Sequence, residues 1–550
     1  MLKDLVYAER LGLWDTSHSS TISISKFCNF SAFYDSLSSR GLGSLELLAL
    51  ELKQQGSFIA RTLSFKGAEF FTAQVALTCD QERTYDLAVE WWTFVQAQLT
   101  VAIEKTKASG NVWRNYWSAH QRMFKELAIC FKIPFLVKDA LQQVQKHNRC
   151  VVIGLQSTGD AGMQSIFESN YKGKRLEEER FDSLMSTASA ILTQFIEKHF
   201  PVKPVPPVAP KLPKEPTAES TEEERHQYIQ IRAQIARLAS LPPPEPLPEL
   251  VKMKKKILKA VSKLDLPPNP LDWVIDQLGG PGMVAEMTGR AARMERRKGY
   301  FVYTKRGATN SSDDSDRINL VERRQFMDGS KPYAIISDAA STGISLHSAR
   351  GSAGGHKRRV HYTIERAWSG DSTVQQLGRS HRSAQVTAPL YKLVVTQLGG
   401  ERRFAAAVSK RLGEMGALTR GDRRAGIGGD MSSFNLDTKF GKRSLKRLYT
   451  ALNNNEIHRM GDHAGQGILP SACLPSQNTK QILSDIVEKR KKAEDPIVAT
   501  LPAEEGPRTS FLLALMTEAL DKVGLDRDKS DMKSFLNRLA GITVCKQDLL

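Results

Sequence analysis

Two arginines three positions apart are the residues of this sequence best suited to phosphate chemistry. Residues 375–382 read QQLGRSHR, so Gln375, Gly378, Arg379 and Arg382 fit the pattern Q-x-x-G-R-x-x-R. Arginines at this spacing lie on one face of a short helix, and a glycine beside them permits close backbone approach. Planar, permanently charged guanidinium groups can clamp a γ-phosphate as charge develops during transfer. An ordinary basic surface helix is the alternative interpretation.

A turn rich in small and hydroxyl side chains precedes these arginines. Residues 333–336 form a short apolar run, and residues 337–346 continue as SDAASTGISL. Small residues permit close approach, and the hydroxyls of Ser337, Ser341 and Thr342 can donate hydrogen bonds to phosphate oxygens. A second apolar run at 360–364 then leads to the arginine pair, so the order is strand, polar turn, strand and arginine motif.

Three segments resemble motifs of the superfamily 2 helicase motor. Residues 337–346 are similar to motif V, which touches the nucleic-acid backbone, and residues 375–382 are similar to motif VI, which closes the motor core. Residues 150–159, an apolar strand ending in QSTG, are similar to motif IV. Within motif VI, residues 379–385 (RSHRSAQ) resemble the R-x-H-R-x-x-Q of chromatin-remodelling ATPases.

Longer segments narrow the resemblance to the Strawberry notch family of helicase-like transcriptional regulators. The longest is residues 388–425, which read APLYKLVVTQLGGERRFAAAVSKRLGEMGALTRGDRRA. The shorter ones are HQRMFK at 120–125, VVIGLQSTGDA at 151–161, LGGPGMVAEMTGR at 278–290 and RQFMDG at 324–329. The resemblance extends over most of residues 1–200 and 266–445.

This resemblance implies a role for each matching residue. In a complete motor, ATP and Mg²⁺ lie between two RecA-like domains, and Arg379 and Arg382 act as catalytic arginine fingers. The implied cofactor-binding residues are Gln375, Gly378, Thr342 and Gly343. The implied nucleic-acid contacts are Ser337, Ser341, Thr342, Ser157 and Thr158. For Ser157 and Thr158, capping the start of a helix is the alternative.

The sequence departs from the family pattern in one important respect. No G-x-x-x-x-G-K-[ST] phosphate loop and no Asp-Glu dipeptide occur in the 550 residues. Without a lysine on the phosphates and a carboxylate on Mg²⁺, phosphoryl transfer lacks its main electrostatic groups. We therefore expect the chain to begin inside a first RecA-like domain and not to hydrolyse ATP by itself. The roles of Arg379 and Arg382 then depend on a partner domain.

The predicted fold class is α/β: a RecA-like helicase C-terminal domain, with a parallel sheet flanked by helices. The tail of a first RecA-like domain precedes it and a mainly helical extension follows. The predicted segments are the first-domain remnant (1–100), connecting helices and the start of the second domain (101–200), a Pro/Lys-rich insertion (201–265), the second RecA-like domain with motifs V and VI (266–445), and a helical extension that packs on the motor or binds partners (446–550).

Local patterns predict further elements. Apolar periodicity indicates helices at 45–54, 85–131, 222–241, 249–264 and 271–278, and alternation indicates a strand at 69–77. A hairpin around Gly299 is expected at 296–306, a polar loop at 310–316, and a flexible, basic surface loop at 350–359.

Two groups of side chains allow either a binding or a structural interpretation. Trp91, Trp92, Trp113 and Trp117 could stack on bases, although packing between helices is the favoured interpretation. Lys252, Lys254, Lys255, Lys256, Lys259 and Lys263 could lie along phosphates, although a solvated lysine face is the more common explanation.

Composition limits the classes of function. A net charge of +18 and a pI near 9.5 favour polyanionic partners, nucleic acid first and an acidic membrane surface second. The six cysteines are scattered without a C-x-x-C pair, which argues against a zinc ribbon or disulfide framework, and no metal site is predicted. No apolar run is long enough to span a membrane, so no membrane partner is expected.

Two functions remain open from the sequence. The first is a nuclear, Strawberry notch-type helicase-like protein that regulates DNA-templated transcription on chromatin, with nucleic-acid-dependent ATPase activity only if a first RecA-like domain is present. Its expected partners are double-stranded DNA and transcription or chromatin-remodelling proteins. The second is a non-enzymatic coregulator that binds nucleic acid or protein.

Overall fold

The structure is a computed structural model of the protein. It describes residues 14, 27, 29–40, 42–54, 56, 68–108, 111–156, 179–206, 210–212, 215, 221–239, 244–261, 263–306, 312–337, 344–365, 375–399, 401, 439–453, 523, 535, 538–544 and 547. Among these residues, no helix is long and apolar enough to cross a membrane.

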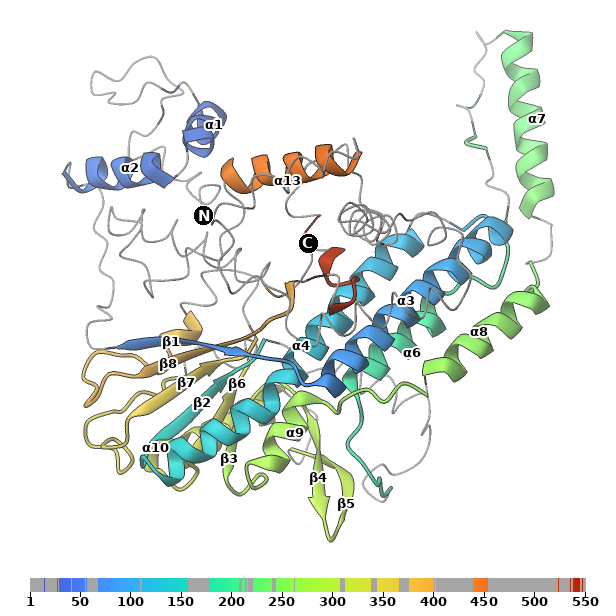
Figure 1. Ribbon diagram of the computed structural model, residues 1–550. Coiled ribbons are helices and arrows are strands. Elements are labelled where there is room, and N and C mark those ends of the chain that lie inside the picture. The colour runs from blue at the N-terminus through green and yellow to red at the C-terminus, as the bar shows by residue number, and fades with distance from the viewer. Residues whose placement is uncertain are drawn as a thin grey trace, which may run out of the picture.

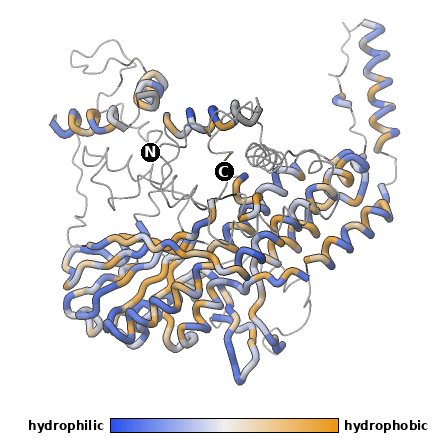
Figure 2. Tube along the Cα trace, viewed as in Figure 1, coloured by the Kyte–Doolittle hydropathy of each residue, from blue (hydrophilic) through white to orange (hydrophobic). Residues whose placement is uncertain are grey.

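A six-stranded sheet is the centre of the described structure (Figure 1). Its order is β1-β8-β7-β2-β6-β3, and every pairing is parallel. The strands are β1 (Glu69–Val75), β2 (Cys150–Gly154), β3 (Val284–Met287), β6 (Tyr333–Ile336), β7 (Arg359–Thr363) and β8 (Leu390–Thr396). Parallel strands buried on both faces need continuous apolar runs, which β2 and β6 have (Figure 2).

Helices cover both faces of this sheet. On one face, the second half of α4 (Asn111–Gln145) and α9 (Pro270–Gln277) pack against β2 and β7, with Ile133 and Val274 fully buried. On the other face, Phe326 of α10 (Ser312–Asp328) is buried against Val152 and Ala334. The predicted α/β class, a parallel sheet flanked by helices, is confirmed.

A helical layer extends beyond the carboxyl ends of the strands (Figure 1). It contains α3 (Cys79–Thr106), the first half of α4, α6 (Thr187–His199) and α8 (Pro248–Val261). A capping box at Thr78 starts α3: the Thr78 side chain accepts from the Gln81 amide, and the Gln81 side chain accepts from the Thr78 amide. Trp91 and Trp92 are buried in this layer, and Trp113 and Trp117 pack against it. The packing interpretation of the tryptophans is confirmed.

Residues near the C-terminus are part of the same layer. The Tyr85 hydroxyl donates to the Ala540 carbonyl at 2.8 Å, and the Val544 amide donates to Asp86 at 2.9 Å. The Arg538 guanidinium lies 3.2 Å from the centre of the Trp117 ring. The expectation that the extension packs on the motor is confirmed for these residues.

The remaining elements lie around this framework. They are α1 (Phe30–Arg40), α2 (Leu42–Gln54), α7 (Glu222–Ala239), the antiparallel hairpin of β4 (Ala292–Arg297) and β5 (Tyr300–Lys305), and α13 (Lys439–Asn453). The predicted hairpin around Gly299 is therefore confirmed, with a longer first strand. The α7 helix stands apart from the other described elements (Figure 1).

One predicted loop is wrong, and a second is present as a loop but is held by packing. The polar segment 310–316 is expected to be a loop, yet α10 begins at Ser312. Acidic residue types are favoured in the first turn of a helix, at the positive end of its dipole. The loop at 350–359 is anchored rather than flexible, since Gly354 and Gly355 are buried. A Cβ on Gly354 would lie 2.7 Å from the Met327 carbonyl oxygen, so this turn is packed against the end of α10.

The element positions also differ from the predicted segments. The predicted first-domain remnant includes β1, but this strand pairs with β8 along its whole length and extends the main sheet. The predicted insertion includes α8, but Leu250 and Ile257 are buried in the helical layer. Elements α3 and α13 run across the predicted boundaries at residues 100 and 445.

Candidate functional site at the carboxyl edge of the sheet

The carboxyl ends of β6, β2 and β7 lie side by side. Gly154, the last residue of β2, is in register with Ile336 on one side and Thr363 on the other. The chain passes from β6 to β7 across β2, so the strand order reverses at this point. In open parallel sheets, ligands bind in the crevice outside the carboxyl ends at such a switch point. We therefore expect the functional residues at this edge.

The motif VI segment lies directly over the end of β2. The Gln376 side chain is buried and donates to the Leu155 carbonyl at 3.3 Å. A Cβ on Gly154 would lie 2.6 Å from Gln376 Cδ, which no real contact tolerates. The glycine at 154 is therefore what permits Gln376 to lie there. The resemblance assigns the nucleotide contact to Gln375, whose side chain is exposed.

The two predicted arginine fingers have different surroundings. Arg379 is 8% exposed, and its Nη1 donates to the Ile344 carbonyl at 3.4 Å. Its own carbonyl accepts from the Leu346 amide at 2.7 Å. Arg382 is exposed, and its amide donates to Gln385 Oε1 at 3.3 Å. Arg379 therefore holds the last residues of the motif V segment, whereas Arg382 is accessible to a ligand.

The prediction that both arginines share a helix face is wrong. The described helical residues end at Leu377, and Gly378, Arg379 and Ser380 form a turn. Amides at Arg379 and Ser380 donate back to the carbonyls three residues earlier, at 3.1 and 3.3 Å. This tight turn, rather than helical periodicity, sets the directions of the two side chains.

Two aromatic groups attach this turn to the sheet. The Tyr391 hydroxyl of β8 donates to the Leu377 carbonyl at 2.8 Å, and His361 Nδ1 of β7 lies 2.8 Å from the Ser380 hydroxyl. Burial lowers the pKa of His361 to about 3, so the ring is neutral at physiological pH. A neutral ring suits a site that must stay next to positively charged arginines.

Glu365, at the end of β7, is a functional candidate that the sequence motifs did not identify. Its carboxylate accepts from the Gln156 amide at 2.7 Å and forms a 2.5 Å ion pair with Lys125 of α4. The contact ties the segment after β2 to the segment after β7. Burial, and then the neighbouring Glu365, raise the pKa of Glu126 to about 8. An acidic residue directly after the apolar run 360–364 was the available signal.

A second lysine of α4 makes a similar contact between the ends of β7 and β8. Lys132 donates to the Ile364 carbonyl at 2.8 Å and pairs with Glu401. Glu401 in turn accepts from the amide and the hydroxyl of Thr396, at 2.7 and 2.6 Å, at the end of β8. Lys125 and Lys132 thus connect one helix to the ends of three neighbouring strands.

Several buried polar atoms at this edge have no hydrogen-bond partner within the described part of the chain. They are Ser337 Oγ, Gln156 Nε2 and Gln376 Oε1. Buried polar groups are normally satisfied, so such atoms are candidates for a ligand contact. The Ser337 hydroxyl, the Gln156 side-chain amide and the Arg382 guanidinium can donate hydrogen bonds to phosphate oxygens. Mg²⁺ fits poorly, because the two carboxylates that the described residues place at this edge, Glu365 and Glu401, are both paired with lysines.

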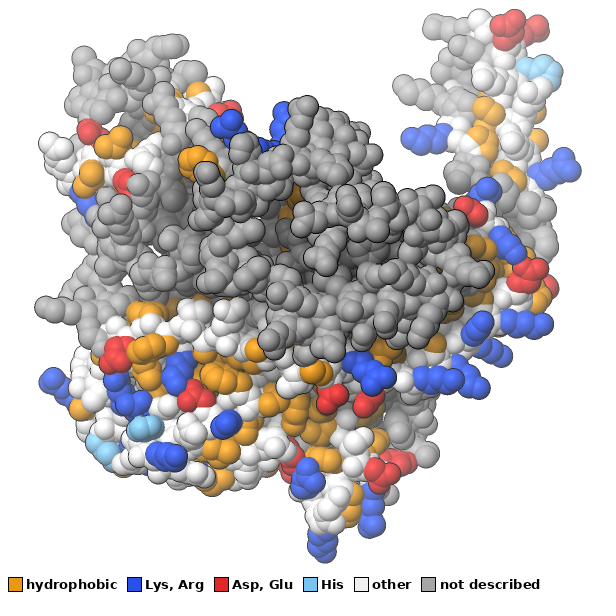
Figure 3. Space-filling model, in the orientation of Figure 1, with side chains coloured by type: hydrophobic (Ala, Val, Ile, Leu, Met, Phe, Trp, Pro, Cys, Tyr) orange, Lys and Arg blue, Asp and Glu red, His pale blue; other side chains and the backbone are white. Residues whose placement is uncertain are grey.

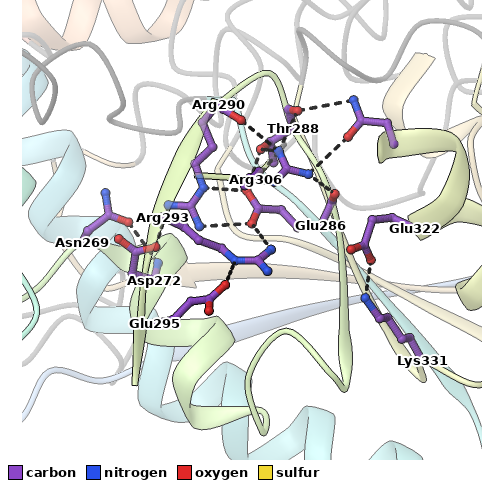
Figure 4. A network of polar contacts seen from close by, with 11 residues as sticks. Asn269, Asp272, Glu286, Thr288, Arg290, Arg293, Glu295, Arg306, Glu322 and Lys331 are labelled. Carbon is purple, nitrogen blue, oxygen red and sulfur yellow. Dashed lines mark hydrogen bonds and ion pairs between the residues drawn. The ribbon is translucent and has the colours of Figure 1, made fainter. Parts of the chain in front are cut away.

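The sheet edge beyond β3 carries a separate polar network (Figure 4). Glu286 is fully buried and pairs with Arg290, Arg293 and Arg306. Burial alone would raise the pKa of Glu286, but Arg290 and Arg306 hold it well below its ordinary value. Arg290 also reaches Asp272 of α9 at 2.6 Å. This network fixes the β4–β5 hairpin to the sheet, and its carboxylates are already paired with arginines.

The structure places only some of the predicted site residues. Ser337, Gln375, Gly378, Arg379 and Arg382 are described, and Ser337 and Arg379 are both within the buried edge. Ser157, Thr158, Ser341, Thr342 and Gly343 lie outside the described residues, so their roles remain predictions.

Comparisons with known sequences give a consistent family. The profile described as "C-terminal domain on Strawberry notch homologue" matches residues 269–550, just over half of the chain. A profile described as "P-loop containing NTP hydrolase pore-1" matches residues 1–87.

Individual relatives cover nearly the whole chain. Protein FORGETTER 1 of Arabidopsis thaliana is 32% identical, over 98% of this chain and 47% of that protein. Protein strawberry notch homolog 1 of Rattus norvegicus is 32% identical, over 100% of this chain and 43% of that protein. Protein strawberry notch of Drosophila melanogaster is 27% identical, over 100% of this chain and 43% of that protein. The chain spans less than half the length of these relatives.

Among solved structures, the C-terminal part of the Fun30 ATPase domain aligns with 61% of this chain and 88% of its own. The identity is 12% and the TM-score is 0.24. An overlay at that score does not establish the fold, and the RecA-like assignment depends on the family profile and the parallel sheet.

Proposed function

The chain belongs to the Strawberry notch family of helicase-like proteins, and from that premise we propose that it supplies the second RecA-like half of a nucleic-acid-dependent ATPase. We place its action in the nucleus, in the regulation of DNA-templated transcription on chromatin. Double-stranded DNA and transcription or chromatin-remodelling proteins are the proposed partners. The observation that carries the proposal is the exposed Arg382 beside a buried, tightly held motif VI turn at the switch point of the sheet.

Each arginine receives a distinct role in this proposal. Arg382 is the group that stabilises charge developing on the γ-phosphate, because it is exposed and permanently charged. Arg379 is a positioning residue, since it holds the carbonyl of Ile344, near the end of motif V. ATP supplies the phosphoryl group to be transferred. The phosphate loop and the Mg²⁺ carboxylate must come from a complete first RecA-like domain, because these 550 residues contain neither motif.

The contacts at the edge support coupling between nucleotide and nucleic acid. Gln376 connects motif VI to the end of β2, and Arg379 connects it to Ile344 near the end of motif V. A displacement of the motif VI turn would therefore move both segments that are proposed to touch the nucleic-acid backbone. Such a linked set of contacts gives an element whose position both ligands can bias.

A non-enzymatic coregulator is the second candidate. The lack of a phosphate loop and an acidic box within the 550 residues favours it. In that case Arg382 contacts a phosphate of the nucleic-acid backbone instead of a nucleotide.

The test is ATP hydrolysis by the intact protein with and without DNA. An arginine finger contributes roughly 10³-fold or more to the rate, so Arg382→Ala should abolish DNA-stimulated hydrolysis. Arg297→Ala is the matched control, since Arg297 is also exposed but lies on the β4–β5 hairpin. Equal rates for wild type and Arg382→Ala would refute the finger role. A wild-type protein that binds DNA without hydrolysing ATP would favour the second candidate.

A further inference from the structure

The α8 helix has two chemically opposite faces. Leu250, Ile257 and Val261 are buried in the helical layer, packed with residues of α3 and α6. The outward face, with the turn that follows the helix, carries exposed lysines, and Lys and Arg side chains gather along α8 (Figure 3). Lys254 is only partly exposed and donates to the Glu197 carbonyl at 2.7 Å, so it is not one of the exposed lysines. The α8 lysine stripe consists of the five exposed lysines Lys252, Lys255, Lys256, Lys259 and Lys263.

The spacing of the α8 lysine stripe follows one helix face. Each member is three or four positions from another member along the sequence, which places them in one band. At a rise of about 1.5 Å per residue, lysines four positions apart are separated by about 6 Å along the axis. Two nucleotides of one strand of duplex DNA rise by about 6.8 Å. The stripe therefore presents a row of ammonium groups spaced closely enough to contact several phosphates of one backbone.

The charge of this face is not balanced within the helix. Like charges four positions apart destabilise a helix by a few tenths of a kcal/mol per pair. The one acidic residue of α8 is Glu249, in its first turn, and it is paired with Lys105 of α3. A face that serves only solubility normally mixes both signs. Repulsion along the stripe would be relieved by a bound polyanion.

The surroundings of α8 favour nucleic acid over a membrane. A basic amphipathic helix binds a membrane by burying its apolar face in the lipid. In α8 that face is already buried against α3 and α6, and no large apolar side chain of α8 is among the exposed ones. The chain runs from the end of α8 to α9, which packs on the sheet (Figure 1). The stripe therefore runs from the outer end of the helical layer toward the sheet.

We propose that the α8 lysine stripe binds the phosphate backbone of nucleic acid and forms a second, sequence-independent contact outside the switch-point site. The inference shares with the proposed function the premise that the ligand is nucleic acid. It does not depend on ATP hydrolysis, because backbone binding requires no nucleotide.

The test is the salt dependence of DNA binding by the full chain without nucleotide. Lys252, Lys255, Lys256 and Lys263 are replaced together by Gln, and affinity for a fluorescein-labelled duplex is measured by anisotropy. Each lost phosphate contact lowers the slope of log K against log[salt] by about 0.9, so a fall of about 3 to 4 is expected. At low salt the affinity should fall at least about tenfold.

A control variant separates the stripe from net charge. Lys146, Lys203, Lys211 and Lys305 are also exposed but scattered, and their joint replacement by Gln removes the same charge. The control should keep a slope near that of wild type. An equal loss in both variants, or no loss in the stripe variant, would overturn the proposal. So would loss of binding to anionic phospholipid vesicles with unchanged DNA binding.

Two further measurements keep the result interpretable. Circular dichroism should be unchanged in the stripe variant, because the substituted side chains are exposed and the buried face is intact. Since nucleotide is left out, a chain without ATPase activity would still show the expected slope. Failure of the proposed ATPase function is thus distinguishable from failure of the stripe.

Discussion

At the scale of single residues, the absence of a side chain at position 154 determines where motif VI lies. Gln376 occupies the space above Gly154 and bonds to the Leu155 carbonyl. The motif pattern alone singles out Gln375, because a pattern records residue types and not which of two adjacent glutamines faces inward. The small residue needed at the end of β2 could be read from the sequence, but its partner more than two hundred positions away could not.

Gly154→Ala should displace the amide end of the Gln376 side chain from the Leu155 carbonyl. Overpacking of this kind costs about 1 to 3 kcal/mol of unfolding free energy, measured by urea denaturation of the full chain. Gly282→Ala is the control, since a Cβ there meets nothing within 4 Å. The alanine should cost less in a Gln376→Ala background, because the clashing side chain is then gone. If the effects of the two substitutions on the unfolding free energy are additive, Gln376 is not the side chain that clashes with the alanine.

His361 should make stability depend on acidity. Its folded pKa of about 3 lies below the unfolded value of about 6.5, so the native state binds fewer protons. Its contribution is fully present above pH 6.5 and is lost as the pH falls from 6.5 toward 3. The loss is up to about 1.4 kcal/mol per pH unit. Urea midpoints for His361→Asn should show a weaker pH dependence than wild type over this range, whereas those for His226→Asn, at an exposed position of α7, should follow wild type.

At the scale of elements, α4 is the helix that joins the two layers. Its first half contributes to the helical layer and its second half covers the sheet. Where the two halves meet, Lys125 and Lys132 reach the ends of the strands. Periodicity predicts a helical stretch at 85–131 and the apolar strands, because both signals are local, but it misses the break between α3 and α4 and the continuation of α4 to Gln145. The pairing of β1 with β8 was not predictable in the same way, because strand order depends on contacts between distant residues.

Removal of the Lys125 charge should be costly. Lys125→Met leaves Glu365 buried and close to Glu126, and breaking a buried pair in this way costs about 3 to 5 kcal/mol. The double variant Lys125→Met, Glu365→Gln should recover much of this loss, since no unpaired charge remains. Lys138→Met, at an exposed position of the same helix, should change the unfolding free energy by less than about 0.5 kcal/mol. A double variant as unstable as the single one would contradict this assignment.

At the scale of the whole molecule, the site depends on residues from most of the chain. The switch-point edge uses α4, β2, β6, β7 and the motif VI turn, and the helical layer behind it includes Ala540 and Val544. Family resemblance could locate the motifs along the sequence. It could not indicate which arginine is buried, because that depends on the tertiary turn around Ser380.

The central claim is that Arg382, and not Arg379, acts on the transferred phosphate. Single-turnover ATP hydrolysis by the intact protein, with DNA present, separates that step from nucleotide binding. Arg382→Ala should reduce the hydrolysis rate by roughly 10³-fold or more while nucleotide affinity changes little, and Arg382→Lys should restore only a part. An Arg382→Ala protein that hydrolyses ATP at the wild-type rate would contradict this role of Arg382.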